Sequence, residues 1–172
     1  MAIAPLIQEG SKLTGGEESG AGRLGFSVAL SADGNTALIG GYNNNDGVGA
    51  VWVFTRSGTT WTPQGPVLTG GKESGEGEFG RSVALSADGN TALIGGPGDN
   101  NSVGAVWVFT RSGATWTQQG EKLTGGGESG EGAFGRSVAL SADGNTALIG
   151  GPGDNNSVGA VWVFTRSGAT WT

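Results

Sequence analysis

Apolar residues along the chain gather in short runs that glycine-rich polar segments separate. In the middle of the sequence these runs are residues 82–86, 91–95 and 105–110, and an alternating segment, 114–118, follows them. Short runs of apolar and β-branched residues between turn signals are typical of strands. The pattern predicts four strands, of which the first three are apolar on both faces and the fourth is half-exposed.

The polar segments between these runs carry turn residues. Ala87-Asp-Gly-Asn90 separates the first two runs, and Asp-Gly accepts the backbone angles of a tight hairpin. Residues 97–102 predict a longer loop before the third strand, and residues 111–113 predict a turn into the fourth.

The whole pattern is repeated. The segment SVALSADGNTALIGG begins at Ser27, Ser82 and Ser137, a spacing of 55 residues each time. The period divides the chain into residues 8–62, 63–117 and 118–172, with 1–7 left over, and we expect each copy to form one structural unit. The second and third copies differ only at positions 63/118, 66/121, 67/122, 72/127 and 78/133.

A small sheet that is apolar on both faces and half-exposed at one edge describes the blade of a β-propeller, packed between neighbouring blades. The predicted fold is therefore all-β, with four-stranded antiparallel blades, three to a chain. A β-trefoil is the alternative, because three copies of four strands also satisfy its pseudo-threefold symmetry.

The motifs resemble the FG-GAP repeat of integrin-like β-propellers. In the second copy Phe79-Gly80 opens the first strand, Gly95-Gly96-Pro97 closes the second, and residues 104–109, GAVWVF, form the third. The third copy repeats these motifs, whereas the first departs from them with Leu24-Gly25-Phe26. The resemblance implies four-stranded blades around an axis, a setting outside the cell or at its surface, and a role in adhesion or ligand binding.

The resemblance also implies calcium in a loop between the first and second strands, but that loop is short here. It holds a single carboxylate in each copy, Asp33, Asp88 or Asp143. Calcium takes about six to eight oxygen ligands. We therefore expect no calcium there, and no other metal or cofactor.

Composition narrows the functional classes. The chain has 37 glycines, only 14% charged residues and a net charge of -6, so we expect very little helix and no nucleic-acid partner. No run approaches membrane-spanning length, and no membrane partner is expected. With no histidine and no cysteine, the usual acid–base and nucleophilic machinery is missing, so the sequence predicts a protein that is not an enzyme.

Candidate ligand-binding residues lie in the Asp/Asn-rich loop before the third strand, where oxygens and amides could hold a metal or a sugar hydroxyl. They are Asn44, Asn45, Asp46, Asp99, Asn100, Asn101, Asp154, Asn155 and Asn156. The same residue types favour turns with left-handed backbone, and we prefer this structural interpretation.

Two further groups receive structural interpretations. The acidic segments 73–76 and 128–131, with Glu17 and Glu18 in the first copy, are interpreted as solvated loop charges. The tryptophans of the third strand, such as Trp107, are interpreted as packing residues, and those of the fourth, such as Trp116, as outer-strand residues that could stack on a sugar if exposed.

Three blades leave two apolar faces in water, whereas propellers close with typically about four to eight blades. We therefore expect self-assembly, with a homodimer of six blades preferred to a homotrimer of nine. Residues 3–7 align with the fourth strand, which predicts an N-terminal strand over residues 1–7. We expect this strand to pair along a partner's third blade, or to compete there with the C-terminal strand, and so to close the ring.

The functional hypothesis is a non-catalytic scaffold or protein-interaction module. The near identity of the second and third copies also suits a fragment or an engineered repeat protein. The alternative function is a carbohydrate-binding propeller with equivalent sites between blades.

Overall fold

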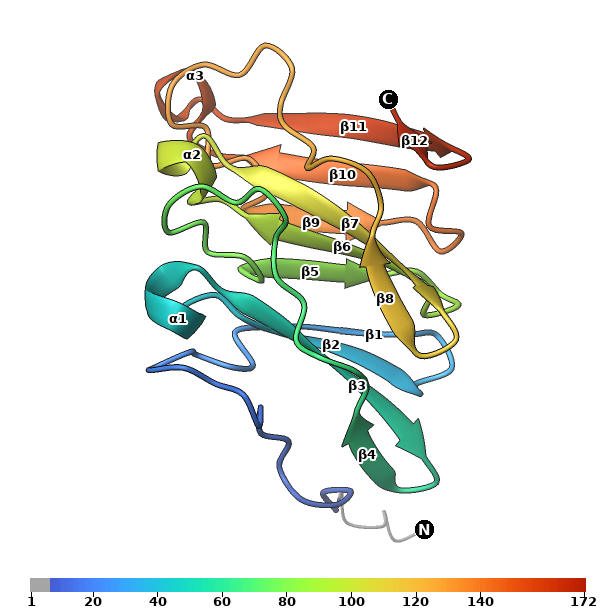
Figure 1. The fold of residues 1–172 in the computed structure, drawn as a ribbon. Helices are drawn as coiled ribbons and strands as arrows, with labels where there is room; N and C mark the ends of the chain where they lie inside the picture. The colour runs from blue at the N-terminus through green and yellow to red at the C-terminus, as the bar shows by residue number, and fades with distance from the viewer. Residues whose placement is uncertain (1–6) are drawn as a thin grey trace, which may run out of the picture.

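The computed structural model describes residues 7–172, which form three separate four-stranded antiparallel sheets (Figure 1). The first sheet contains β1 (Ser27–Leu30), β2 (Thr36–Gly41), β3 (Ala50–Ser57) and β4 (Thr60–Pro63). The second contains β5 (Ser82–Leu85), β6 (Thr91–Gly96), β7 (Ala105–Ser112) and β8 (Thr115–Gln118). The third contains β9 (Ser137–Leu140), β10 (Thr146–Gly151), β11 (Ala160–Ser167) and β12 (Thr170–Trp171).

The strands of each sheet are hydrogen-bonded in chain order, as in a propeller blade. The register is the same in every sheet: Ile39 faces Trp52, and Ile94 faces Trp107 in the second blade. This arrangement confirms the predicted propeller blades, and the alternative, a β-trefoil, is not formed.

Helix is confined to single turns that follow the second strand of each blade. These turns are α1 (Asn44–Gly47), α2 (Asp99–Ser102) and α3 (Asp154–Ser157). All three lie on one side of the row of sheets, opposite the hairpins that join the first and second strands (Figure 1). The expectation of very little helix is confirmed.

The blades lie side by side in chain order, and the first strands of neighbouring blades contact each other. The Ser27 hydroxyl of the first blade donates to the Gly80 carbonyl at 2.7 Å, and Ser82 donates to Gly135 at 2.8 Å. The blades therefore meet along their inner strands, whereas β4 and β8 form the outer edges.

Close approach between blades explains the first of the two glycines that end the second strand. A Cβ atom at Gly40 would overlap the Gly80 carbonyl oxygen, and one at Gly95 would overlap that of Gly135. Any larger residue would push the neighbouring blade away. The first glycine of the Gly-Gly motif is therefore required by blade packing, whereas a Cβ atom at the second, Gly41 or Gly96, would overlap the tryptophan of its own blade.

Two hydrophobic clusters fill the spaces between blades. Leu38, Val51 and Val53 of the first blade pack in one cluster with Ile94 and Trp107 of the second. The other cluster joins the opposite face of the second blade to the third, and contains Leu93, Val106, Val108, Phe134, Ala147 and Ile149. Both faces of the middle blade are covered, as the two-sided apolar strands predict.

The two outermost faces have no neighbouring blade among the described residues, although Leu13 and Leu24 pack over the part of the first blade that contains Trp52. The first blade exposes Phe26, Val28 and Leu30, and we call these residues the leading face. The third blade exposes Leu148, Val158, Val161 and Val163, which we call the trailing face. The molecule thus ends in an apolar sheet face on each side.

Removing a side chain from a covered face should reduce stability strongly. Leu93 is 0% exposed, so Leu93→Ala should lower the free energy of unfolding by about 2–5 kcal/mol, because it leaves a cavity between two blades. Urea denaturation followed by tryptophan fluorescence measures this change. Thr115→Ala, on the exposed outer strand, is the control, and an equal loss in both variants would contradict the packing scheme.

Candidate functional site

The Asp/Asn-rich residues predicted as a ligand site form the helical turns α1, α2 and α3. The turns are left-handed inside: φ is 51° at Asn100 and 56° at Asn101, with similar values at Asn155 and Asn156. Asparagine tolerates this backbone better than most residues. The structure therefore gives these residues the turn geometry that their side chains favour.

The first residue of α2 is a buried carboxylate. The Asp99 side chain is 1% exposed, its Oδ1 accepts a hydrogen bond from the Ser74 amide at 2.8 Å, and its Oδ2 forms an ion pair with Lys122 Nζ. Ser74 lies in the segment that enters the second blade, and Lys122 in the segment that leaves it. Asp99 therefore holds the two connecting segments together.

The equivalent residues of the other blades repeat the first of these contacts. Asn44 Oδ1 accepts from the Ser19 amide at 2.7 Å, and Asp154 Oδ1 accepts from the Ser129 amide at 2.7 Å. Position one of each turn is thus a fastening point for a connecting segment, in agreement with the structural interpretation.

The other predicted residues are mostly exposed and are not gathered into one site. Asn45, Asp46, Asn100, Asn155 and Asn156 are exposed on separate turns. Asn156 lines a small open cavity of about 300 Å³. Asn101 lines a larger open cavity of about 620 Å³ together with Glu76, Glu78 and Arg136. This polar hollow at the α-turn side of the blades is the candidate ligand surface, and the binding role of these residues stays a prediction.

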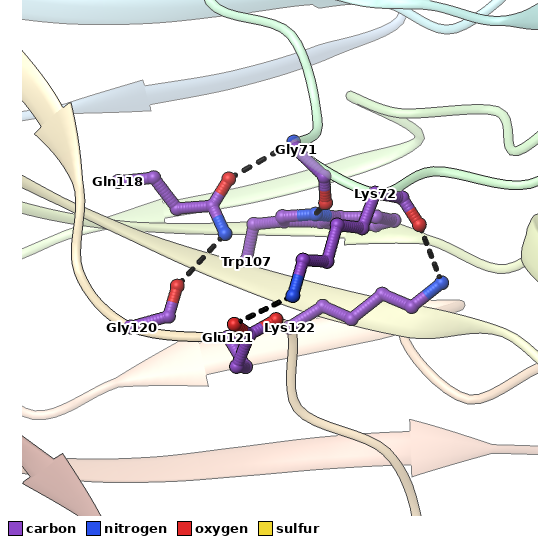
Figure 2. A network of polar contacts seen from close by, with 7 residues as sticks. All are labelled: Gly71, Lys72, Trp107, Gln118, Gly120, Glu121 and Lys122. Atoms are coloured by element: carbon purple, nitrogen blue, oxygen red, sulfur yellow. Dashed lines mark hydrogen bonds and ion pairs between the residues drawn. The ribbon is translucent and has the colours of Figure 1, made fainter.

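A network of polar contacts surrounds Trp107 (Figure 2). The Trp107 indole donates to the Gly71 carbonyl at 2.9 Å, and the Gly71 amide donates to the Gln118 side chain at 2.9 Å. Lys122 Nζ donates to the Lys72 carbonyl at 2.9 Å. The segments that enter and leave the second blade are therefore joined over the indole of its third strand.

The interpretation of the acidic segments as solvated charges is wrong for Glu73 and Glu128. Burial, and then the nearby Asp99 carboxylate, raise the pKa of Glu73 to about 8. Burial and Asp154 raise the pKa of Glu128 in the same way. Glu73 Oε1 is buried without a hydrogen-bond partner among residues 7–172. The glycine-rich sequence around these residues gave no sign that they fold inward.

The carboxylate of the short hairpin loop is used within the loop. Asp88 accepts hydrogen bonds from the Ser86 hydroxyl and from the Asn90 amide, at 2.5 and 3.0 Å, and the Ser86 bond is the main cause that lowers the pKa of Asp88. Within residues 7–172, no group of three His, Cys, Asp or Glu side chains could hold a metal ion. The absence of calcium stays a prediction.

The outer-strand tryptophans contact arginine and glutamine side chains of the blades. The Arg111 guanidinium lies 5.4 Å from the Trp116 ring centroid, and the Trp116 indole donates to Gln64 at 3.2 Å. Arg166 and Trp171 repeat the stacked arrangement in the third blade. One face of each of these rings is therefore covered by arginine, which leaves less room for a sugar. Trp107, at 0% exposed, is a packing residue as predicted.

Comparison with known proteins agrees with this fold. Residues 116–164 match the family model described as the FG-GAP repeat. A search among curated proteins found no similar sequence. The sequence match and the fold together support the predicted β-propeller of FG-GAP type.

Two solved structures with propeller-like folds are similar in shape. Sqt1 from Saccharomyces cerevisiae has a TM-score of 0.57 and 16% identity over 87% of this chain and 33% of its own. A putative 6-phosphogluconolactonase from Bacteroides uniformis has a TM-score of 0.54 and 15% identity over 83% of this chain and 36% of its own. The chain thus spans about a third of each neighbour, and the likeness concerns the fold alone.

None of the helices in residues 7–172 has the length and apolar character that crossing a membrane requires.

The raised pKa of Glu73 makes stability depend on pH. The folded state holds a proton on Glu73 up to about pH 8, whereas the unfolded chain releases it near 4.5. Between these two pH values the folded state therefore binds more protons than the unfolded chain. The contribution of Glu73 to the free energy of unfolding is complete below pH 4.5 and is lost as the pH rises toward 8.

Glu73→Gln should remove this dependence, because the amide stays neutral. The variant should unfold at a higher denaturant concentration than the wild type at pH 8.5, with a smaller difference at pH 5, as measured by urea titration. Glu76→Gln, at an exposed residue of the same segment, is the control. An unchanged pH profile in Glu73→Gln would show that Glu73 is solvated.

Proposed function

We propose that the protein is a non-catalytic propeller scaffold, a protein-interaction module that assembles with further copies of itself through its leading and trailing faces. The exposure of these two faces is the observation that carries the proposal. Val161 and Val163 are 67% and 61% exposed, whereas their counterparts in the middle blade, Val106 and Val108, are 0% and 1% exposed.

The leading and trailing faces carry the counterparts of two blade faces that pack against each other inside the molecule. Inside the molecule, the side of a blade that bears Val106 and Val108 packs against Val138 and Leu140 of the next blade. Val28 and Leu30 on the leading face are the counterparts of Val138 and Leu140 at the 55-residue period, and the trailing face carries the counterparts of Val106 and Val108. A trailing face can therefore pack on a leading face by the contact already used twice within the chain.

Exposed apolar surface of this kind favours association, because burial removes it from water. Two copies joined at both ends supply six blades, within the usual range of about four to eight for closed propellers. Three copies would supply nine, and we therefore propose the homodimer.

A role without catalysis is supported by what the polar side chains do. The most buried carboxylate, Asp99, is paired with Lys122 and fastens two connecting segments. The carboxylates of the hairpin loops are hydrogen-bonded to their own loops. The lectin alternative has no observation in its favour, since arginine already covers one face of the outer tryptophans.

The mass of the protein in solution tests the proposal. Light scattering during gel filtration at micromolar concentration should give about twice the chain mass of 17.0 kDa. Val163→Asp should give the single-chain mass, because a carboxylate on the trailing face would be buried without a partner. Thr115→Asp, on the outer strand, should leave the mass unchanged. A wild-type protein of single-chain mass would contradict self-assembly.

A further inference from the structure

We propose that the N-terminal segment, residues 8–13, of a second copy completes the third blade, and that Lys12 of that copy forms an ion pair with Asp154. The inference rests on the proposed self-assembly and specifies the residues that join one copy to the next. It follows from comparing what covers the second blade with what the third blade lacks.

The second blade is completed by the segment that leaves it, residues 118–123. Lys122 forms an ion pair with Asp99 at the start of α2. It also donates a hydrogen bond to the Lys72 carbonyl (Figure 2). Leu123 pairs with Val106 of β7 through two backbone hydrogen bonds of 3.0 and 2.7 Å. This segment therefore pairs with the buried carboxylate at the start of α2 and adds hydrogen bonds to the third strand of the blade.

The third blade has the same receiving groups, and within residues 7–172 no segment equivalent to 118–123 is bound at them. Asp154 is the counterpart of Asp99, and it makes no ion pair within residues 7–172. Val161, the counterpart of Val106, is 67% exposed. The 55-residue period places Lys12 and Leu13 of a following copy where Lys122 and Leu123 stand in the second blade.

The N-terminal segment already has the conformation that this contact needs. The Gln8 side chain donates to the Gly10 carbonyl at 3.0 Å, as Gln118 donates to Gly120 at 2.9 Å. The φ angles of Gly10 and Gly120 are 69° and 73°. Residues 8–13 are therefore shaped like the segment that completes the second blade, before any partner is bound.

The same segment is also fastened to the first blade of its own chain. Arg56 contacts Glu9 at 3.3 Å, where Arg111 contacts Gln64 at 3.2 Å and Arg166 contacts Gln119 at 3.4 Å. A second copy would thus present Lys12 and its leading face together, as one surface.

Charge matching points to a copy of this chain as the occupant. Between the first two blades the paired positions are Asn44 and Val67, and both are uncharged. Between the second and third blades they are Asp99 and Lys122, which form an ion pair.

At the two open ends the corresponding residues are Asp154 and Lys12, an acid and a base. The pair observed within the chain, Asp99 with Lys122, is an acid with a base, and Asp154 and Lys12 repeat this combination of charges. Asp154 with an uncharged partner would leave a carboxylate buried alone, which is costly.

Charge exchange tests the pair. In Asp154→Lys every contact between copies would set the introduced lysine against Lys12, and in Lys12→Asp it would set the introduced aspartate against Asp154. Each variant alone should associate at least about 100-fold more weakly than the wild type, because a buried ion pair becomes a like-charge contact. Analytical ultracentrifugation over a concentration series measures this loss.

Mixing the two variants should restore association. A ring with one copy of each places the introduced lysine beside the introduced aspartate at one contact, and the native Asp154 beside the native Lys12 at the other. Native mass spectrometry should therefore find a dimer of one Asp154→Lys chain and one Lys12→Asp chain, with few dimers of either alone. The double variant D154K/K12D should form homodimers.

Controls and contrary outcomes keep this inference separate from the proposed function. Glu121→Lys carries the same charge change as Asp154→Lys at a side chain that is 72% exposed, and it should associate as the wild type does. Lys12→Asp changes an exposed residue, so it tests the pair even if Asp154→Lys fails to fold.

Dimeric single variants, or a mixture without heterodimers, would overturn the ion pair while leaving self-assembly in place. A wild-type protein that stays monomeric would overturn both. Wild-type particles larger than two copies would overturn the two-copy ring.

Discussion

A blade of this sequence is apolar on both faces, and burying both faces requires a neighbouring blade on each side. The middle blade meets this condition: Leu93 on one face and Ile94 on the other are both 0% exposed. Other features of the fold allow or strengthen the contact between neighbouring blades. The first glycine at the end of the second strand lets neighbouring blades approach, and the serine hydroxyls of the first strands donate hydrogen bonds to the next blade. The exposed ends follow from the same condition, since each outer blade has a neighbour on one side among the described residues.

The connecting segments matter as much as the sheets, because each one belongs to two blades. Leu68 lies in the second sequence period but pairs with Val51 of the first blade, and Gly71, three residues later, accepts a bond from Trp107 of the second. Asp99 binds the segment that enters the second blade through Ser74, and it binds the segment that leaves this blade through Lys122. The proposed role of Asp154 and Lys12 follows from this arrangement: Asp154 of one copy would pair with Lys12 of another, as Asp99 pairs with Lys122 within the chain.

Much of the fold could be predicted from sequence, because strands and hairpins depend on local pattern. The alternation of apolar runs and Asp-Gly turns placed the strand limits within a few residues, and positive φ occurs at Gly89 of the hairpin as expected. The blade was recognisable because its strands are apolar on both faces. The predicted N-terminal strand lies outside the described residues except for Ile7, which is 84% exposed, and it stays a prediction.

The candidate site was harder to predict, because its polar contacts join residues that are distant in sequence. Lys122 and Asp99 are 23 residues apart, and Ser74 and Asp99 are 25 apart. Nothing local distinguishes half-buried Glu73 from exposed Glu76 in one glycine-rich segment. A comparison of the copies would have indicated the pair of Asp99 and Lys122. One period earlier, the two equivalent positions hold the uncharged residues Asn44 and Val67. Differences between copies thus point to contacts between blades.

Amide hydrogen exchange tests most directly whether another copy covers the outer blades. The Val106 amide donates to Leu123, and the Ala87 amide donates to Ala142 of the next blade. Their counterparts, Val161 and Ala142, have no such acceptor within residues 7–172. If a second copy supplies Leu13 and Ala32, the Val161 and Ala142 amides should exchange about as slowly as those of Val106 and Ala87. Rapid exchange at Val161 and Ala142, with slow exchange at the other two, would contradict the account.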